Sequence, residues 1–215
     1  MLIGISGMIA SGKSSLSEKL HKNFSSSELL HEFEDDDVVF NTFLKWLYEK
    51  KENISIGFQA YILENHASKL QQILKQLKQQ NQDDLIFLDR FSLEHHLFAQ
   101  ILLKDKPLNY WKAYEAIFEN IITRNELPDF AIFLDISFET FKKRIFQRGR
   151  EAEIDNWEEN YEYFKTLHSL YFESFSNMCK KYNLEYAVID TNNLTEDQVL
   201  KEALRIIQTK INKEH

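Results

Sequence analysis

A phosphate-binding motif near the amino end constrains the fold of this chain more than any other feature. Residues 7–14 read GMIASGKS, which matches the pattern G-x-x-x-x-G-K-[ST], and they directly follow an apolar run at residues 2–5. The motif predicts a strand, then a loop whose backbone amides converge on phosphate oxygens, and then a helix whose positive end faces the anion. A turn of this sequence without a ligand is the alternative, and the strand and helix around the motif argue against it.

We expect the loop to bind a triphosphate together with Mg²⁺. In loops of this type the lysine, here Lys13, reaches the outer phosphates, and the hydroxyl of the following residue, Ser14, is an oxygen ligand for Mg²⁺. The residues that we expect to contact the nucleotide are Gly7, Met8, Ile9, Ala10, Ser11, Gly12, Lys13, Ser14 and Ser15.

Composition and charge restrict the classes of partner. The 215 residues include 26 Lys and Arg against 34 Asp and Glu, which gives a formal net charge of -8 and argues against a general nucleic-acid binder. Hydrophobic residues form 43% of the chain, enough for a sizeable core. The single cysteine, Cys179, excludes an intrachain disulfide. Because the sequence has no apolar stretch of membrane-spanning length and no leader pattern, we expect a cytoplasmic protein without a membrane partner.

Apolar runs alternate with helical patterns along the chain. Strands are predicted at residues 2–6, 29–33, 85–88, 131–134 and 186–189. Residues 53–80 fit one long helix or two in succession, and further helices should begin near Ser137 and near Thr195, which has capping-box spacing to Gln198. The alternation predicts an α/β fold with a five-stranded parallel sheet and helices on both faces. Two prolines and the lack of a Gly/Ser-rich linker favour one domain over residues 1–215.

Two charged residues follow the third predicted strand. Asp89 and Arg90 would lie at the carboxyl edge of the sheet, where the phosphate loop must also lie. Asp89 could hold Mg²⁺ through water or take part in acid/base chemistry, and Arg90 could bind a phosphate or neutralise charge on the transferred group. A surface ion pair at the end of a strand is the alternative interpretation.

Three arginines form a second candidate cluster. Arg144 and Arg148 are four residues apart, so they share a helix face, and Arg150 follows closely. An arginine at the transferred phosphoryl group can accelerate the reaction by about 10³ to 10⁵. Residues 148–155 interrupt two helical patterns and could be a mobile loop over the phosphates. The alternatives are a solvated connection between helices and surface pairing of the arginines with nearby glutamates.

Two further residues are candidates for contact with a substrate. If the second strand reaches the carboxyl edge, Glu32 could accept a proton from an attacking hydroxyl, although the sequence around it reads first as an acidic solvated turn. The amide of Gln59 could read a nucleobase edge, where adenine and cytosine both offer a matching donor and acceptor. A neighbouring backbone group could satisfy that amide instead.

Taken together, these residues resemble the deoxyribonucleoside kinase family, whose members transfer the γ-phosphate of ATP to the 5′-hydroxyl of a deoxynucleoside. The resemblance spans most of the chain. Besides the phosphate loop, it rests on residues 29–32 (LLHE), 46–50 (WLYEK), 58–61 (FQAY), 89–90 (DR) and 144–150 (RIFQRGR), the last followed by Glu153.

The resemblance implies a P-loop kinase fold and a role for each candidate residue. Glu32 would be the general base, Asp89 would lie near Mg²⁺, and Arg90 would contact the reacting groups. Gln59 would hold the base of the substrate. The remaining contacts implied are Phe58 and Phe98 beside the base, Tyr48 and Glu153 on the 3′-hydroxyl, and an arginine lid formed by Arg144, Arg148 and Arg150. The family further implies ATP and Mg²⁺ as cofactors and a homodimer formed by helices.

Two departures from the better-known family pattern bear on the substrate. The segment after Arg90 is one residue shorter than in many members, which leaves the role of Glu94 open. His66 stands where many relatives have an arginine, which leaves the choice between purine and pyrimidine open. The aspartate at Asp89 resembles the bacterial deoxyadenosine and deoxyguanosine kinases, so we expect a purine deoxynucleoside.

Two other classes of function also fit the phosphate loop. The first is another P-loop small-molecule or nucleoside-monophosphate kinase, since the fold does not fix the substrate. The second is a nonenzymatic ATP-binding subunit whose state a partner senses, which would need Lys13 but not Glu32. A switch GTPase is less favoured, because the sequence lacks an Asn-Lys-x-Asp motif and residues 190–193 do not supply one.

Overall fold

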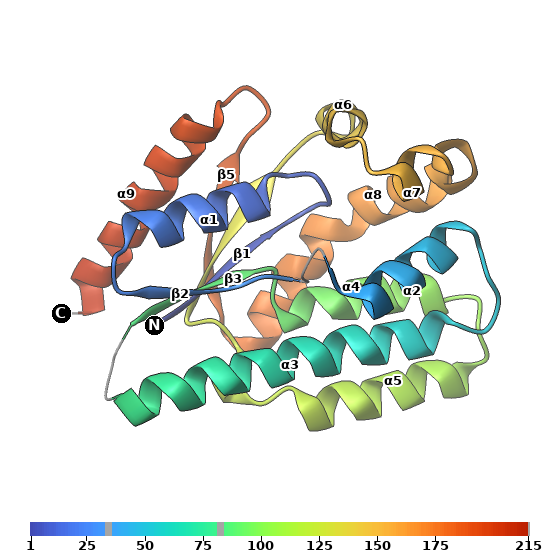
Figure 1. Ribbon diagram of the computed structural model, residues 1–215, viewed down its shortest axis with the longest axis horizontal. Helices are drawn as coiled ribbons and strands as arrows, with labels where there is room; N and C mark the ends of the chain where they lie inside the picture. The colour runs from blue at the N-terminus through green and yellow to red at the C-terminus, as the bar shows by residue number, and fades with distance from the viewer. Residues whose placement is uncertain (33–35, 81–83, 215) are drawn as a thin grey trace.

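A parallel β-sheet forms the centre of the computed structural model, which describes residues 1–32, 36–80 and 84–214 (Figure 1). The strands lie in the order β2-β3-β1-β4-β5, and every neighbouring pair is parallel. They are β1 (Leu2–Gly7), β2 (Ser27–Leu30), β3 (Leu85–Asp89), β4 (Phe130–Asp135) and β5 (Glu185–Asp190). The predicted α/β class with a five-stranded parallel sheet is therefore confirmed.

Helices cover both faces of the sheet (Figure 1). One face packs against α1 (Lys13–Asn23) and α9 (Glu196–Glu214). The helices on the other face are α3 (Ser55–Gln80), α4 (Ser92–Leu103) and α8 (Trp157–Tyr182), and α5 (Leu108–Ile121) packs on α3 and α4. The remaining elements are α2 (Val38–Tyr48), a 3₁₀ turn at Arg124–Glu126, α6 (Phe138–Arg148) and α7 (Glu151–Ile154). No helix in the described ranges is long and apolar enough to span a bilayer.

The period-two alternation of strand side chains divides the core into two layers. Ile3 and Ile5 of β1 pack with α1 and α9, whereas Ile86 and Leu88 of β3 pack with the helices of the opposite face. Both layers are apolar because a parallel sheet covered on both sides buries both sets of side chains. This packing leaves the carboxyl edge of the sheet as the place where polar residues gather.

The second strand differs from its prediction. It was expected over residues 29–33, but β2 pairs from Ser27 to Leu30, with Ser27 opposite Leu85. The apolar run missed its start because Ser27 is buried through hydrogen bonds: its hydroxyl donates to the carbonyl oxygen of Phe24 at 2.7 Å. Residue 33 lies outside the described residues. Each of the other strands begins and ends within one residue of its predicted position.

The predicted helices are present. Residues 55–80 form one continuous helix, α3, which decides between the one-helix and two-helix alternatives. Ser137 caps α6, since its hydroxyl accepts from the backbone amide of Thr140 at 3.1 Å. Thr195 and Gln198 form the expected reciprocal pair at the start of α9, at 2.8 and 3.3 Å.

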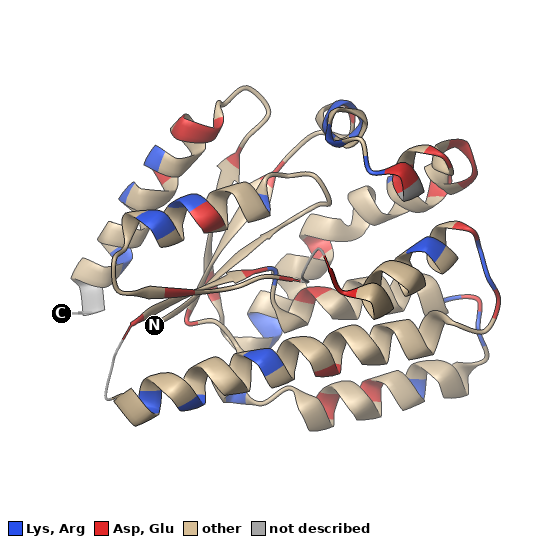
Figure 2. Ribbon diagram, in the orientation of Figure 1, with Lys and Arg blue, Asp and Glu red and all other residues tan. Residues whose placement is uncertain are grey.

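The arginine-rich segment at residues 148–155, considered above as a possible mobile loop, includes a short helix. Helix α6 ends at Arg148, Gly149 adopts the left-handed conformation with φ of 71°, and α7 begins at Glu151. Glycine favours this helix-ending geometry, and acidic residues favour the first turn of a new helix. The basic residues of α6 are thus followed directly by the acidic residues of α7 (Figure 2). A lid that closes over the phosphates stays a prediction.

The phosphate loop requires glycine at its first position. Gly7 has φ of 142°, and a Cβ there would lie 2.6 Å from the carbonyl oxygen of Leu134. Gly12, with φ of 99°, is the residue from which α1 begins. Only glycine adopts such conformations without strain, so the two fixed glycines of the motif turn the chain from β1 into α1.

Candidate active site

A cavity of about 1030 Å³ opens where β1 and β3 end. The phosphate loop and α1 form one end of it, and α2, α3 and α4 form the other. The predicted site residues that line it are Ile9, Ala10, Ser11, Gly12, Lys13, Ser14, Ser15, Glu32, Tyr48, Phe58, Gln59, Asp89, Arg90, Phe98, Arg144, Arg148, Arg150 and Glu153. Residues that are far apart in the sequence therefore share one space.

Gly7 and Met8, which were also predicted to contact the nucleotide, are not among the residues that line the cavity. They shape the loop from behind. The carbonyl oxygen of Met8 accepts from the backbone amide of Ser11 at 3.0 Å and from the Lys13 ammonium at 3.1 Å. This arrangement folds the lysine side chain back along the loop.

Lys13 is buried in a site of mixed charge. Burial and the nearby Arg90 lower the pKa of its ammonium to about 8, while Glu32, Asp89 and Glu94 act in the opposite direction. A bound triphosphate would add negative charge beside this group and favour its protonated form. The residue therefore fits an anion site that becomes fully cationic when the anion arrives.

Asp89 and Ser14 provide oxygen atoms next to the phosphate loop. Burial raises the pKa of the Asp89 carboxyl, against the effects of the Lys13 charge and of a hydrogen bond from Ser14. Asp89 Oδ1 is buried without a hydrogen-bond partner among the described residues. Mg²⁺ in phosphate sites commonly takes one or two protein oxygens and completes its shell with phosphates and water, so this donor set fits the ion. Within residues 1–32, 36–80 and 84–214, no group of three or more His, Cys, Asp or Glu side chains is arranged to hold a metal.

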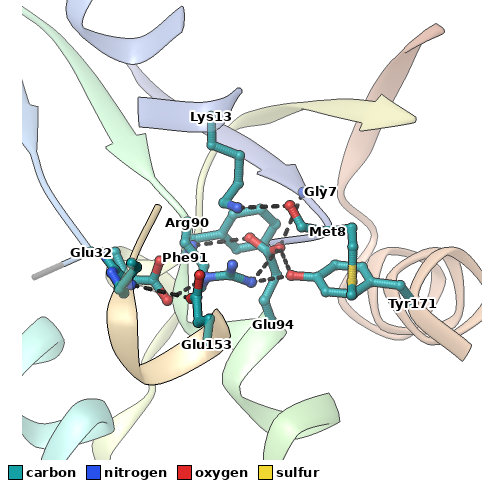
Figure 3. A network of polar contacts seen from close by, with 10 residues as sticks. Gly7, Met8, Lys13, Glu32, Arg90, Phe91, Glu94, Glu153 and Tyr171 are labelled. Atoms are coloured by element: carbon teal, nitrogen blue, oxygen red, sulfur yellow. Dashed lines mark hydrogen bonds and ion pairs between the residues drawn. The ribbon is translucent and has the colours of Figure 1, made fainter. Parts of the chain in front are cut away.

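Arg90 lies at the centre of a buried network (Figure 3). Its Nε is 2.5 Å from Glu32 Oε1, and its Nη1 is 3.3 Å from Glu94 Oε2 and donates to the Tyr171 hydroxyl. Burial opposes the charge of Arg90, but the carboxylates nearby and the Tyr171 phenol together raise its pKa above the usual value. The guanidinium therefore stays charged. Its backbone φ of 69° is unusual for a residue with a side chain and costs about 1 kcal/mol or more. Such an outlier at the end of a strand is typical of functional sites.

Glu94, whose role the sequence left open, is a structural member of this network. Its Oε2 accepts from the Tyr171 hydroxyl at 2.7 Å and from the backbone amide of Gly7 at 3.4 Å, and its Oε1 accepts from the backbone amide of Phe91 at 3.3 Å. Glu94 follows Phe91 by three residues and caps its backbone amide, but phenylalanine has no side-chain acceptor, so the sequence carries no capping-box signature here. Tyr171 lies in the middle of α8 and gave no signal either.

The three arginines do not form one cluster. Arg144 donates to the carbonyl oxygen of Ser11 at 3.1 Å and to that of Thr191 at 2.7 Å, so it joins the phosphate loop to the segment before α9. Arg148 and Arg150 pair instead with Glu153, whose side chain is 1% exposed. The alternative of pairing with nearby glutamates is therefore realised, although Glu153 is buried rather than at the surface.

The cavity wall beside Glu153 includes Tyr48. Burial is the main cause that raises the pKa of the Tyr48 hydroxyl, and the Glu153 carboxylate adds to it. The phenol therefore stays protonated and can donate a hydrogen bond. A phenol and a carboxylate side by side offer a donor and an acceptor, which is the complement of an alcohol.

The far end of the cavity is aromatic, with one amide. Gln59 is 1% exposed, and its Oε1 has no hydrogen-bond partner in the described chain. Phe58 stacks on Phe43 with ring centroids 5.3 Å apart, and Phe98 lies 4.8 Å from the Arg90 guanidinium. An amide with an open acceptor between aromatic side chains suits a flat, polar ring.

Several residues that line the cavity were missed by sequence reasoning. Among them are His95 of α4, Tyr163 of α8, and Thr191, Leu194 and Thr195 before α9. Thr195 was recognised only as a helix cap, and none of these residues gave a signal of a place in the cavity, because tertiary packing brings their elements there. Their positions would have required knowledge of how α4, α8 and α9 cross the sheet edge.

Comparisons with known proteins show which family this chain belongs to. A family model described as deoxynucleoside kinase matches residues 3–212. A deoxyadenosine kinase of Dictyostelium discoideum is 29% identical over 83% of this chain and 68% of its own. A deoxyadenosine/deoxycytidine kinase of Bacillus subtilis is 26% identical over 92% and 89% of the two chains. A solved structure of deoxyadenosine kinase from M. mycoides with bound dATP superposes with a TM-score of 0.71, at 26% identity and 99% coverage of both chains.

Proposed function

The chain belongs to the deoxynucleoside kinase family and is a kinase, and from this premise we propose that it transfers the γ-phosphoryl group of ATP to the 5′-hydroxyl of a purine deoxynucleoside. The observation that carries the proposal is that one cavity is lined by Lys13 at one end and by Gln59 at the other, with Glu32 and Arg90 also in its wall. A phosphate donor and a nucleoside acceptor can thus meet in a single space.

We assign the phosphate loop and Asp89 to the donor. Lys13 would bind the outer phosphates, and Ser14 and Asp89 would hold Mg²⁺, which would neutralise charge on the phosphates when bound. Arg144, already fixed to the Ser11 carbonyl oxygen, would lie beside them. In phosphoryl transfer a protein acts chiefly by positioning and by electrostatic stabilisation, which this donor set provides.

We assign Glu32 as the general base for the attacking hydroxyl. Its carboxylate lies in the cavity wall, and its ion pair with Arg90 fixes its position. A base must come within hydrogen-bond reach of the proton that it removes, and the 5′-hydroxyl of a nucleoside between the two ends would meet that requirement. Arg90 would then stabilise the charge that develops on the transferred group.

We assign the rest of the cavity to the nucleoside. Gln59 would bind the base between Phe58 and Phe98, and Tyr48 with Glu153 would bind the 3′-hydroxyl. Because Arg148 and Arg150 pair with Glu153, binding of the sugar would also affect the arginines that we expect to cover the phosphates. Exclusion of water at this stage would suppress hydrolysis of ATP.

The purine preference rests on Asp89 in its motif and on the names of relatives, among them the deoxyadenosine kinase of Dictyostelium discoideum. We keep three further expectations as proposals: one domain over residues 1–215, a homodimer formed by helices, and a cytoplasmic location. Size-exclusion chromatography with light scattering would measure the oligomeric state.

A phosphorylation screen tests the proposed function. The protein is given ATP and Mg²⁺ with each of the four deoxynucleosides, their ribose counterparts and the nucleoside monophosphates, and product formation is measured. We expect deoxyadenosine or deoxyguanosine to be the best acceptor. Phosphorylation of monophosphates but not of nucleosides would overturn the proposal in favour of a nucleoside-monophosphate kinase.

The variant Glu32→Gln tests the role of the base. It keeps the shape of the side chain but cannot accept the proton, so kcat should fall by about 10² to 10⁴ while ATP still binds. An unchanged kcat would argue against Glu32 as the base. ATP binding without turnover in the unaltered protein would favour the nonenzymatic alternative.

A further inference from the structure

His95 is a buried polar residue of the cavity wall that has no role in the assignments above. It lies in the first turns of α4, is 1% exposed, and lines the same cavity as Gln59. Its Nε2 has no hydrogen-bond partner among the residues that the structure describes. A buried nitrogen without a partner costs about 1 to 3 kcal/mol, so such an atom on a residue that lines a cavity points to a polar ligand.

The surroundings of His95 restrict what that ligand can be. The ring of His66 from α3 packs against it edge to face, with centroids 5.7 Å apart, and the Nδ1 of His66 is 3.5 Å from the Ser92 hydroxyl. Gln59 lies two helical turns before His66 on the same face of α3 and has an open Oε1. The Nε2 of His66 is also buried without a partner among the described residues, but His66 does not line the cavity. Gln59 and His95, one from each helix, are therefore the two groups of this set that a ligand in the cavity would meet.

His95 is uncharged in this environment. Burial is the main cause that lowers the pKa of its imidazole well below the usual value, and His66 and Arg90 act in the same direction. Burial likewise lowers the pKa of His66 to about 4. A neutral imidazole has one N–H donor and one acceptor nitrogen, so His95 suits a neutral ligand edge rather than a phosphate.

We propose that His95 reads the nucleobase: its Nε2 forms a hydrogen bond with the purine that Gln59 binds, and this contact contributes to the preference for a purine over a pyrimidine. The proposal rests on the proposed function and makes it more specific. The amide of Gln59 alone matches adenine and cytosine equally well, since both present an amino donor beside a ring acceptor. A second polar group from another helix supplies the contact that can distinguish the two, because only a purine carries a second ring with further polar atoms.

The variant His95→Phe tests the proposal, because it keeps a flat ring and removes the polar nitrogen. We expect kcat/KM for deoxyadenosine to fall by about tenfold and that for deoxycytidine to fall much less, so that the ratio of the two changes by about tenfold. His95→Gln, whose amide reaches about as far as Nε2, should restore part of the ratio. The matched control is His96→Phe: its ring packs against Trp111 at 5.0 Å and Phe118 at 5.2 Å, outside the cavity lining, and the ratio should not change.

Two substrate analogues locate the contact on the base. 7-Deaza-2′-deoxyadenosine lacks the N7 acceptor, and purine 2′-deoxyriboside lacks the 6-amino group. For the unaltered protein, we expect kcat/KM for one of the two analogues to be about tenfold lower than for deoxyadenosine. For His95→Phe, we expect kcat/KM for that analogue to be about equal to the variant's value for deoxyadenosine. The thermal unfolding of each variant is measured alongside, since a loss of structure would lower kcat/KM for every base together.

The outcomes separate this inference from the proposed function. Suppose that the unaltered protein phosphorylates deoxynucleosides, and that the ratio of kcat/KM for deoxyadenosine to that for deoxycytidine in His95→Phe and in His95→Gln equals the ratio in the unaltered protein. The role of His95 is then overturned and the kinase assignment stands. The role of His95 would also be overturned if, for each analogue, kcat/KM relative to deoxyadenosine fell by the same factor in the unaltered protein and in His95→Phe. If the unaltered protein phosphorylates no nucleoside, the proposed function itself fails.

Discussion

The two ends of the cavity are built in different ways. The phosphate end comes from contiguous residues between β1 and α1, and its geometry is set by backbone, with Gly7 and Gly12 at the turns. The base end comes from side chains of helices that are distant in the sequence, such as Gln59 on α3 and His95 on α4. The Oε1 of Gln59 and the Nε2 of His95 have no hydrogen-bond partner among the described residues.

The difference suggests how one fold can keep its chemistry and vary its substrate. Backbone amides in a fixed loop bind any triphosphate, so changes elsewhere leave that end intact. Buried side chains at the base end determine which base can satisfy them, and one substitution there would alter the choice. The network of Arg90, Glu94 and Tyr171 forms a common support, because Glu94 also accepts a hydrogen bond from the Gly7 amide.

Loss of Lys13 should have the largest effect and should act on the phosphate end alone. Lys13→Met removes the ammonium that we assign to the outer phosphates, so kcat/KM should fall by about 10² to 10³ for purine and pyrimidine nucleosides alike. Steady-state kinetics with deoxyadenosine and deoxycytidine measures both. Lys22→Met, in an exposed position of the same helix, is the control and should leave kcat/KM unchanged. A changed ratio between the bases in Lys13→Met would break the separation of the two ends.

Glu94→Gln should weaken the support that both ends share. The amide keeps the size of the side chain but removes the ion pair to Arg90, and it places a donor among the groups that donate to Glu94. We expect the free energy of unfolding to fall by about 2 to 4 kcal/mol. Chemical denaturation measures it, with Glu173→Gln on the exposed side of α8 as control. A change within 0.5 kcal/mol, roughly that of ordinary surface substitutions, would show that the network does not support the site.

The pH dependence of ATP binding should give the smallest effect and sharpen the account of the phosphate end. Because burial lowers the pKa of Lys13 to about 8, the ammonium loses its proton as the pH rises from 7 to 9. ATP binds best to the protonated form, so the Kd should rise by up to about tenfold over that interval. Calorimetry at both pH values measures it, and Lys13→Met should show no such rise. A Kd independent of pH in the unaltered protein would contradict the role of this charge.

The phosphate end of the cavity could be predicted from the sequence more completely than the base end. The phosphate loop, the individual strands and the capped starts of α6 and α9 were predictable, because each depends on residues within a few positions of one another. The parallel sheet followed from the alternation of strands with helices. Local residues made Glu32 and Gln59 candidates but left alternatives open for both, and the family resemblance implied their specific roles. His95 and Tyr171 gave no signal, since their roles depend on where α4 and α8 pack. The short helix α7 within residues 148–155 was not predicted, because Gly149 ends one helix and α7 begins only two residues later.

The most direct test of the account is to identify the products of one reaction. The protein, ATP and Mg²⁺ are mixed with deoxyadenosine, and phosphorus NMR follows every phosphate. We predict that ADP and deoxyadenosine 5′-monophosphate appear in equal amounts, because one cavity would bring the phosphate donor to the sugar hydroxyl. ADP with inorganic phosphate but no nucleotide product, or no consumption of ATP at all, would contradict it.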